Sequence, residues 1–146
     1  MTVRWATPDD KNDVFKIALH AHSEIGIFPF SVEKFQALWA TYTDQMGGAC
    51  GVIGEPGQLQ GAVFLGVSTT FYSDELYLSD RFLFVYPAYR KSTNARDLVE
   101  FSKYIAREME MKLLMGITTL EKTRQKVEFY ERQLGAPVGA VFLWRP

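Results

Sequence analysis

The sequence predicts one domain of the α/β (α+β) class, spanning 1–146, with four helices on both faces of a mixed, mostly antiparallel sheet of six to seven strands. Three observations predict this fold. Apolar residues recur at helical spacing in four segments, β-rich runs lie between these segments, and Gly- and Pro-containing turns separate the two kinds of element. The chain is 47% hydrophobic and 23% charged, which is typical of a globular domain with a sizeable core.

The first part of the chain predicts a short strand followed by two helices. Thr2–Ala6 is the strand, and the first helix starts after Thr7, where Pro8 suits the first helical position. Ser31 is the expected cap of the second helix. The apolar residues of this second helix recur at i, i+3, i+4 and i+7, and they are Phe35, Leu38, Trp39 and Tyr42.

The middle of the chain predicts three strands. Ala49–Gly54 and Leu59–Ser68 flank a turn rich in Pro and Gly, so we expect them to form a hairpin. Glu75–Val85 is a long strand that ends before Pro87. Simple alternation places four apolar residues of this strand on one side: Leu76, Leu78, Phe82 and Phe84.

The last part of the chain predicts helix, strand, helix and strand. The third helix runs over Ala95–Met109, and Lys112–Ile117 is an apolar strand suited to burial on both faces. Thr118 or Thr119 caps the fourth helix, and Val138–Trp144 is a final strand. A strand-helix-strand unit favours parallel pairing with a right-handed crossover, whereas the earlier hairpin is antiparallel, so the sheet is mixed.

The turn between the long strand and the third helix is the most informative stretch. It is basic and rich in hydroxyl groups, and it leads directly into a helix. The first N–H groups of a helix have no partner inside the helix, and the helix dipole places partial positive charge there. Such a turn can hold a phosphate or diphosphate group. An ordinary capped helix start with solvated basic residues is the alternative.

This stretch resembles the acetyl-CoA-binding segment of the GNAT N-acetyltransferases. Val85–Ala95 reads VYPAYRKSTNA, and the family has Val-x-Pro-x-Tyr-Arg followed by Arg/Gln-x-x-Gly-x-Gly/Ala. Arg90 and Ala95 fit the two ends of that turn, whereas Thr93 stands where the family usually has Gly. Phe129–Ala136 resembles the late Phe-Tyr-x-x-x-Gly-Phe segment, and the order of elements is also that of the GNAT fold, which short phage-encoded proteins share.

The resemblance implies acetyl-CoA as the acetyl donor, and two histidines and one cysteine do not favour a metal site. Backbone N–H groups in the turn bind the diphosphate, with added charge from two basic side chains, and the end of the long strand binds the pantetheine arm and polarises the thioester carbonyl. The expected cofactor-binding residues are Phe84, Val85, Arg90, Lys91, Ser92, Thr93, Asn94 and Ala95.

Two catalytic residues are expected. The resemblance implies that Tyr130 protonates the departing CoA thiolate, although a core tyrosine is the commoner fate of such a residue. Asp80 is the candidate general base, with Glu75 and Glu24 as other candidates and water as a further one. A solvated or ion-paired Asp80 is the alternative interpretation.

Composition restricts the partners. The net charge of −1 does not favour nucleic acid or an anionic membrane, and no apolar run is long enough to span a bilayer. The N-terminus lacks the layout of a signal peptide, and the single cysteine, Cys50, excludes an internal disulfide, so a cytoplasmic location is expected. The implied partner is a small-molecule or peptide amine acceptor, and a homodimer is open because dimers are common in the family.

Two functions therefore stay open. The first is an N-acetyltransferase that transfers acetyl from acetyl-CoA to a primary amine by direct attack. The second is a binding or structural protein that keeps the fold without catalysis, either a CoA sensor or an interaction module of phage type. The absence of glycine between Tyr89 and Leu98 supports the second function.

Overall fold

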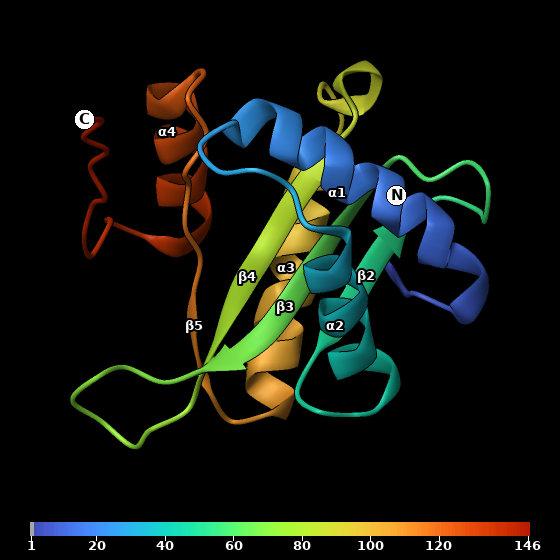
Figure 1. Cartoon of the computed structure of the whole chain (residues 1–146), viewed down its shortest axis with the longest axis horizontal. Coiled ribbons are helices and arrows are strands. Elements are labelled where there is room, and N and C mark those ends of the chain that lie inside the picture. The colour runs from blue at the N-terminus through green and yellow to red at the C-terminus, as the bar shows by residue number, and fades with distance from the viewer. Residues whose placement is uncertain (1) are drawn as a thin grey trace.

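The computed structural model describes residues 2–146 and shows a five-stranded sheet between two layers of helices (Figure 1). Neighbouring strands pair antiparallel, except that the last pair, β4 and β5, is parallel. In chain order, which is also their order in the sheet, the strands are β1 (Arg4–Trp5), β2 (Ala49–Ile53), β3 (Gly61–Ser68), β4 (Tyr77–Val85) and β5 (Lys112–Leu114).

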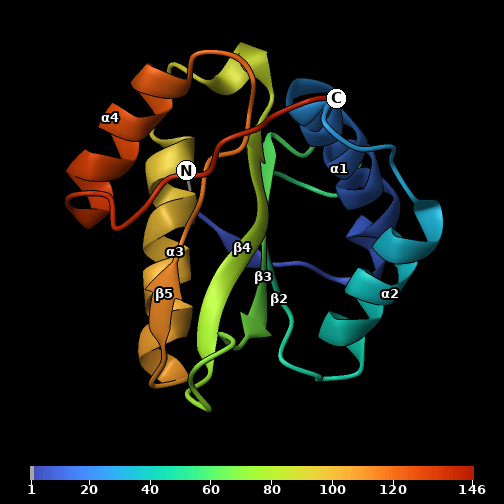
Figure 2. The same ribbon diagram turned by 60° about the vertical axis from the view of Figure 1, so that its left-hand side comes forward.

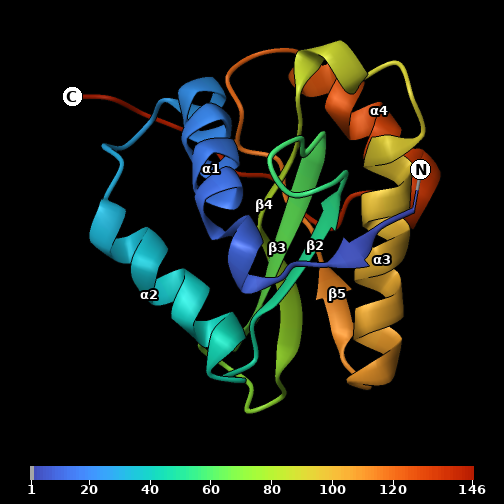
Figure 3. The ribbon, with the colours of Figure 1, turned by 90° about the vertical axis from the view of Figure 1, so that its right-hand side faces the viewer.

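Two helices lie on each face of the sheet (Figure 2). One face carries α1 (Lys11–Ile25) and α2 (Val32–Thr43), and the other carries α3 (Asn94–Glu108) and α4 (Thr123–Leu134). Short 3-10 turns, η1 (Pro8–Asp10) and η2 (Pro87–Tyr89), precede α1 and follow β4. Figure 3 shows β1 at the edge of the sheet, close to α3. The expected α+β class and the four helices on both faces are confirmed.

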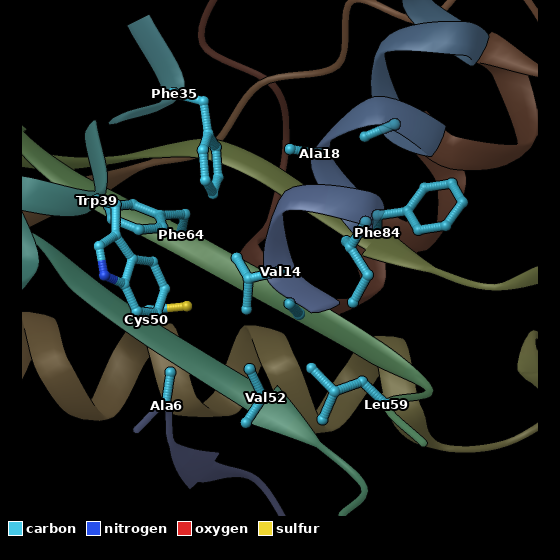
Figure 4. Packing of buried hydrophobic residues seen from close by; sticks show 13 residues of the cluster. Ala6, Val14, Ala18, Phe35, Trp39, Cys50, Val52, Leu59, Phe64 and Phe84 are labelled. Atoms are coloured by element: carbon cyan, nitrogen blue, oxygen red, sulfur yellow. The ribbon is translucent and has the colours of Figure 1, made fainter. Parts of the chain in front are cut away.

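The sheet separates two hydrophobic cores. On the α1 and α2 side, the rings of Trp39 and Phe64 lie 6.5 Å apart, and Cys50 is buried beside them (Figure 4). On the α3 side, Leu65, Leu78 and Leu98 are fully buried. Burying each such side chain contributes about 1.5–3 kcal/mol, so both faces of the sheet are anchored to their helices.

A bulge interrupts β4 at Arg81. Phe64 of β3 pairs with Phe82, but the next residue, Leu65, pairs with Asp80, so Arg81 is an extra residue on β4. As a result Leu78 packs in the α3-side core and Phe84 in the α1-side core. The expectation that both lie on one side was wrong, because an inserted residue reverses the alternation of side chains.

The sheet has five strands, fewer than the six to seven expected. The predicted strand Val138–Trp144 does not form, and its side chains are exposed, with Val138 at 91% and Phe142 at 89%. The predicted buried strand Lys112–Ile117 is also shorter, because β5 is the edge of the sheet and pairs over three residues only. A segment rich in strand-forming residues forms a strand only where a neighbouring strand is free to pair with it, and composition does not show whether one is.

A buried ion pair connects β1 to the start of α1. The Asp10 side chain is 0% exposed and accepts hydrogen bonds from Nη1 and Nη2 of Arg4, at 2.8 and 2.9 Å, and from the N–H of Thr7 at 2.7 Å. The Arg4 hydrogen bonds outweigh burial and hold the pKa of Asp10 below its ordinary value of 3.8. The pair therefore fixes the first helix against the edge of the sheet.

Asp10→Asn should make the fold less stable and less sensitive to acid. The folded state lowers the pKa of Asp10, so its contribution to stability is complete above about pH 3.8 and is lost as the pH falls below that value. We expect the substitution to lower the free energy of unfolding by about 2 kcal/mol at pH 7, and by much less at pH 2.5. Urea denaturation at both pH values measures this, and equal losses at the two values would contradict it.

Candidate active site

The strands β4 and β5 separate shortly after they meet. Their pairing ends at Ser79 and Leu114, and the chain after β5 then moves away from β4 toward the top of the molecule (Figure 1). The bulge at Arg81 lies directly beyond this last pair, and a bulge increases strand twist. The flank of β4 opposite β3 is therefore open from Asp80 to Val85.

Unpaired backbone groups of β4 point into this open flank. Tyr86 donates its N–H to the Gln60 carbonyl at 2.9 Å, which fixes the alternation of hydrogen bonds between β3 and β4. The polar groups of Phe84 consequently point to β3, whereas those of Leu83 and Val85 point away from it. Of the two strand residues predicted to bind the cofactor, Phe84 and Val85, it is Val85 that carries the outward-pointing backbone groups.

The turn before α3 holds a group of free N–H donors. Within residues 2–146, the backbone N–H groups of Lys91, Ser92, Thr93 and Ala95 have no hydrogen-bond acceptor. The N–H of Asn94 donates to Ser92 Oγ at 3.1 Å. These donors, with the positive end of the α3 dipole, can bind an anionic group.

The side chain of Asn94 holds the turn in place. It is buried, and its Nδ2 donates to Gln60 Oε1 at 2.9 Å. Gln60 directly precedes β3 and also accepts the hydrogen bond from Tyr86 described above. Asn94 thus fixes the first turn of α3 against the sheet and places the free donors near the end of β4.

Thr93 does not obstruct the turn through its backbone. Its φ and ψ of −85° and 2° are open to any residue, so glycine is not required for conformation. Its hydroxyl turns aside and donates to Asp97 Oδ2 at 2.7 Å. Asp97, in the first turn of α3, places negative charge near the donors and opposes anion binding, although Arg96 Nε lies 3.8 Å from its Oδ1.

Arg90 folds back toward the strand. Its Nε donates to the Val85 carbonyl at 2.8 Å, its Nη2 donates to Glu24 Oε1 on α1, and its guanidinium carbon lies 5.1 Å from the centre of the Phe84 ring. Arg90 thus occupies one of the outward-pointing acceptors of β4, and Lys91 is the basic side chain next to the free donors.

The two predicted catalytic residues lie on β4 and α4. Burial raises the pKa of Tyr130, and the negative charge of Asp80 raises it further. Burial also raises the pKa of Asp80, whose Oδ1 accepts from the Gly116 N–H at 3.0 Å. A phenol with a raised pKa keeps its proton at neutral pH but is a weaker acid, so its use as a proton donor depends on being held close to the leaving group.

The other base candidates are placed differently. Glu75 is exposed, precedes β4 and pairs with Lys112 at 2.8 Å, at the closed end of the strand pair. Glu24 lies at the open end and contacts both Arg90 and Lys126, whose Nζ is 3.8 Å from its Oε2. Sequence reasoning missed Lys126, because its position near Glu24 depends on how α4 packs and leaves no local signal.

The segment between β5 and α4 is bonded to the end of α1 and to α4. Leu120 donates its N–H to the Glu24 carbonyl at 3.4 Å, and Lys126 Nζ donates to Thr119 Oγ1 at 2.8 Å. Within residues 2–146, no cluster of His, Cys, Asp or Glu is placed to hold a metal ion, and no helix is both long and apolar enough to cross a bilayer.

Solved structures with this architecture include several acetyltransferases of low sequence identity. AAC(6′)-Iy, in complex with the bisubstrate analogue CoA-S-monomethyl-acetylneamine, is 11% identical with a TM-score of 0.76, and the match covers 99% of this chain and 96% of that one. AAC(6′)-IG from Acinetobacter haemolyticus, in its apo form, is 12% identical with a TM-score of 0.70 and coverages of 100% and 97%.

A third similar structure is an aminoglycoside acetyltransferase from an uncultured soil metagenomic sample, in complex with sisomicin. It is 12% identical, with a TM-score of 0.73 and coverages of 99% and 95%. No family profile and no curated protein matches the sequence. The structural matches show that the chain has the fold of the GNAT acetyltransferases over its full length.

Asp80→Asn should stabilise the protein at neutral pH. The folded state raises the pKa of Asp80, so ionisation of its carboxyl group weakens the fold as the pH rises from about 3.8 through the higher folded value. The amide keeps an oxygen acceptor for the Gly116 N–H but carries no charge. We expect the free energy of unfolding to increase by about 1 kcal/mol at pH 7 and to change little at pH 3. Urea denaturation checks this, and a loss of stability at pH 7 would contradict it.

Proposed function

We propose that the protein is an N-acetyltransferase that transfers acetyl from acetyl-CoA to a primary amine. One observation carries the proposal: free N–H donors at the start of α3 lie beside the open flank of β4. The first feature suits the diphosphate of CoA, and the second suits its pantetheine arm. The CoA bisubstrate analogue bound to AAC(6′)-Iy supports this choice of cofactor.

The proposed reaction is direct attack of the amine on the thioester. The amine nitrogen forms a bond to the acetyl carbon, and the bond from this carbon to sulfur breaks. An outward N–H of Leu83 or Val85 stabilises the oxyanion that forms. Tyr130 donates its proton to the departing thiolate, and Asp80 or water accepts the proton lost by the nitrogen.

The proposed acceptor is a small-molecule or peptide amine. Two of the similar structures support aminoglycosides as the acceptor class, since one holds sisomicin and the other a neamine derivative. Glu24, at the open end of β4, supplies the negative charge that a cationic amine requires.

The second candidate function is that of a protein with the acetyltransferase fold that does not catalyse acetyl transfer. Two observations favour it: Arg90 already occupies the Val85 carbonyl, and Asp97 places negative charge beside the free donors. Isothermal titration calorimetry with acetyl-CoA and an assay for released CoA thiol over a panel of amines separate the two. Binding without turnover indicates a CoA sensor, and the absence of binding at millimolar cofactor contradicts both the enzyme and the sensor.

Ala95→Pro should weaken CoA binding while sparing the fold. The substitution removes one free N–H from the first turn of α3, where proline is tolerated because that N–H has no helical acceptor. Loss of one hydrogen bond to a charged group should raise the Kd for CoA about tenfold. Ala95→Ser, which keeps the N–H, is the matched control, and an equal effect of both variants in calorimetry would contradict the assignment.

Tyr130→Phe should lower kcat and leave cofactor binding unchanged. Removing a positioned proton donor costs about 100-fold or more in the rate of the chemical step. The release of CoA thiol measures turnover, and calorimetry measures the Kd for acetyl-CoA. Undiminished turnover would exclude Tyr130 as the acid, whereas equal losses in binding and turnover would indicate a structural role.

A further inference from the structure

We propose that Arg90 has two working positions and thereby couples the binding of cofactor and acceptor. Without cofactor, Arg90 holds the carboxylate of Glu24. When CoA binds, Arg90 turns to the diphosphate, and the released Glu24 binds the ammonium group of the acceptor. This inference rests on the proposed function and adds the binding site and charge of the acceptor to it.

The first step is a competition for the Val85 carbonyl. Arg90 Nε donates to this oxygen at 2.8 Å, and the oxygen points into the flank where the pantetheine arm is proposed to lie. A cofactor that uses this flank displaces the guanidinium. The free N–H donors of Lys91, Ser92 and Thr93 follow Arg90 in the chain, so the displaced guanidinium lies next to the bound diphosphate. Arginine binds phosphate strongly through its fork of N–H donors.

The second step concerns the charge that Arg90 leaves behind. The side chain of Glu24 is 24% exposed, and the nearest cation besides Arg90 is Lys126, at 3.8 Å. Lys126 Nζ also donates to Thr119 Oγ1 at 2.8 Å, and its distance from Glu24 Oε2 is too long for a hydrogen bond. Departure of Arg90 removes the close partner of Glu24 Oε1, and a carboxylate that is mostly shielded from water needs another.

An amine acceptor supplies this partner. A primary amine with a pKa near 10 enters as an ammonium ion at neutral pH, and it must lose one proton to water before its nitrogen can attack the thioester. The ammonium group of the acceptor replaces the guanidinium of Arg90 beside Glu24. The net charge around Glu24 therefore stays the same, and its carboxylate keeps a cationic partner. The acceptor site is therefore incomplete until CoA has bound, and it favours cationic acceptors over neutral ones.

Calorimetry with CoA tests the coupling. Because Glu24 competes with the diphosphate for Arg90, Glu24→Gln should bind CoA about fivefold more tightly than the wild type. In an Arg90→Met background the same substitution should have no effect. Glu33→Gln, an exposed glutamate at the start of α2, is the matched control for the loss of one charge and should leave the Kd unchanged.

The outcomes separate this inference from the proposed function. If wild-type protein does not bind CoA, the proposed function fails and this inference fails with it. If wild-type protein binds CoA and Glu24→Gln does not bind it more tightly, only the coupling fails. The NMR resonance of the Arg90 Nε–H gives a measurement that needs no Glu24 variant, and it can be assigned by its loss in Arg90→Met. Its chemical shift should change when CoA is added to wild-type protein. An unchanged chemical shift would contradict the two positions of Arg90.

A pair of synthetic probes tests the role of Glu24 toward the acceptor. Each probe is CoA with an alkyl chain on its sulfur, and the chain ends in an ammonium group or in a methyl group. The ammonium probe should bind wild-type protein about tenfold more tightly than its methyl counterpart, and Glu24→Gln should abolish that difference. If no chain length shows a preference for ammonium in the wild type, Glu24 is not the acceptor's anchor.

Discussion

The structure depends on one constraint: beyond Ser79, β4 has a paired neighbour on one side only. A residue inserted at Arg81 twists the strand at the point where its parallel partner ends, and the polar groups of Leu83 and Val85 are left facing away from the sheet. Buried or half-buried backbone groups of this kind need a partner. Arg90 provides one for the Val85 carbonyl, which is why a side chain from the following turn lies across the end of the strand.

Local patterns in the sequence were sufficient to predict the helices, the hairpin and the order of the elements as far as α4. Thr7 and Ser31 were expected as caps, and both occupy the N-cap position of a helical segment. The errors arose where pairing with a distant partner decides the structure. A bulge at Arg81 leaves no trace in composition, and the segment Val138–Trp144 has the residues of a strand but no edge to join.

The candidate site shows the same division. The turn from Arg90 to Ala95 could be recognised because its features are contiguous in the chain. Asp80 and Tyr130 were predicted from separate local patterns, and they lie on β4 and α4, whose packing those patterns do not determine. The contact between Glu24 and Arg90 spans 66 residues, so no sequence pattern could predict that the two side chains meet. Positions within one turn are predictable, whereas charges brought together by the packing of α1 against the sheet are not.

The burial of Cys50 has a practical consequence for experiments on this protein. Its thiol is fully enclosed in the α1-side core, and burial raises its pKa, so it stays in the unreactive protonated form. A disulfide-exchange dye will therefore find no nucleophile on the native chain. If such a dye reacts with the protein alone, the core has opened and exposed the Cys50 thiol. The reaction of Cys50 with the dye therefore measures unfolding during long incubations.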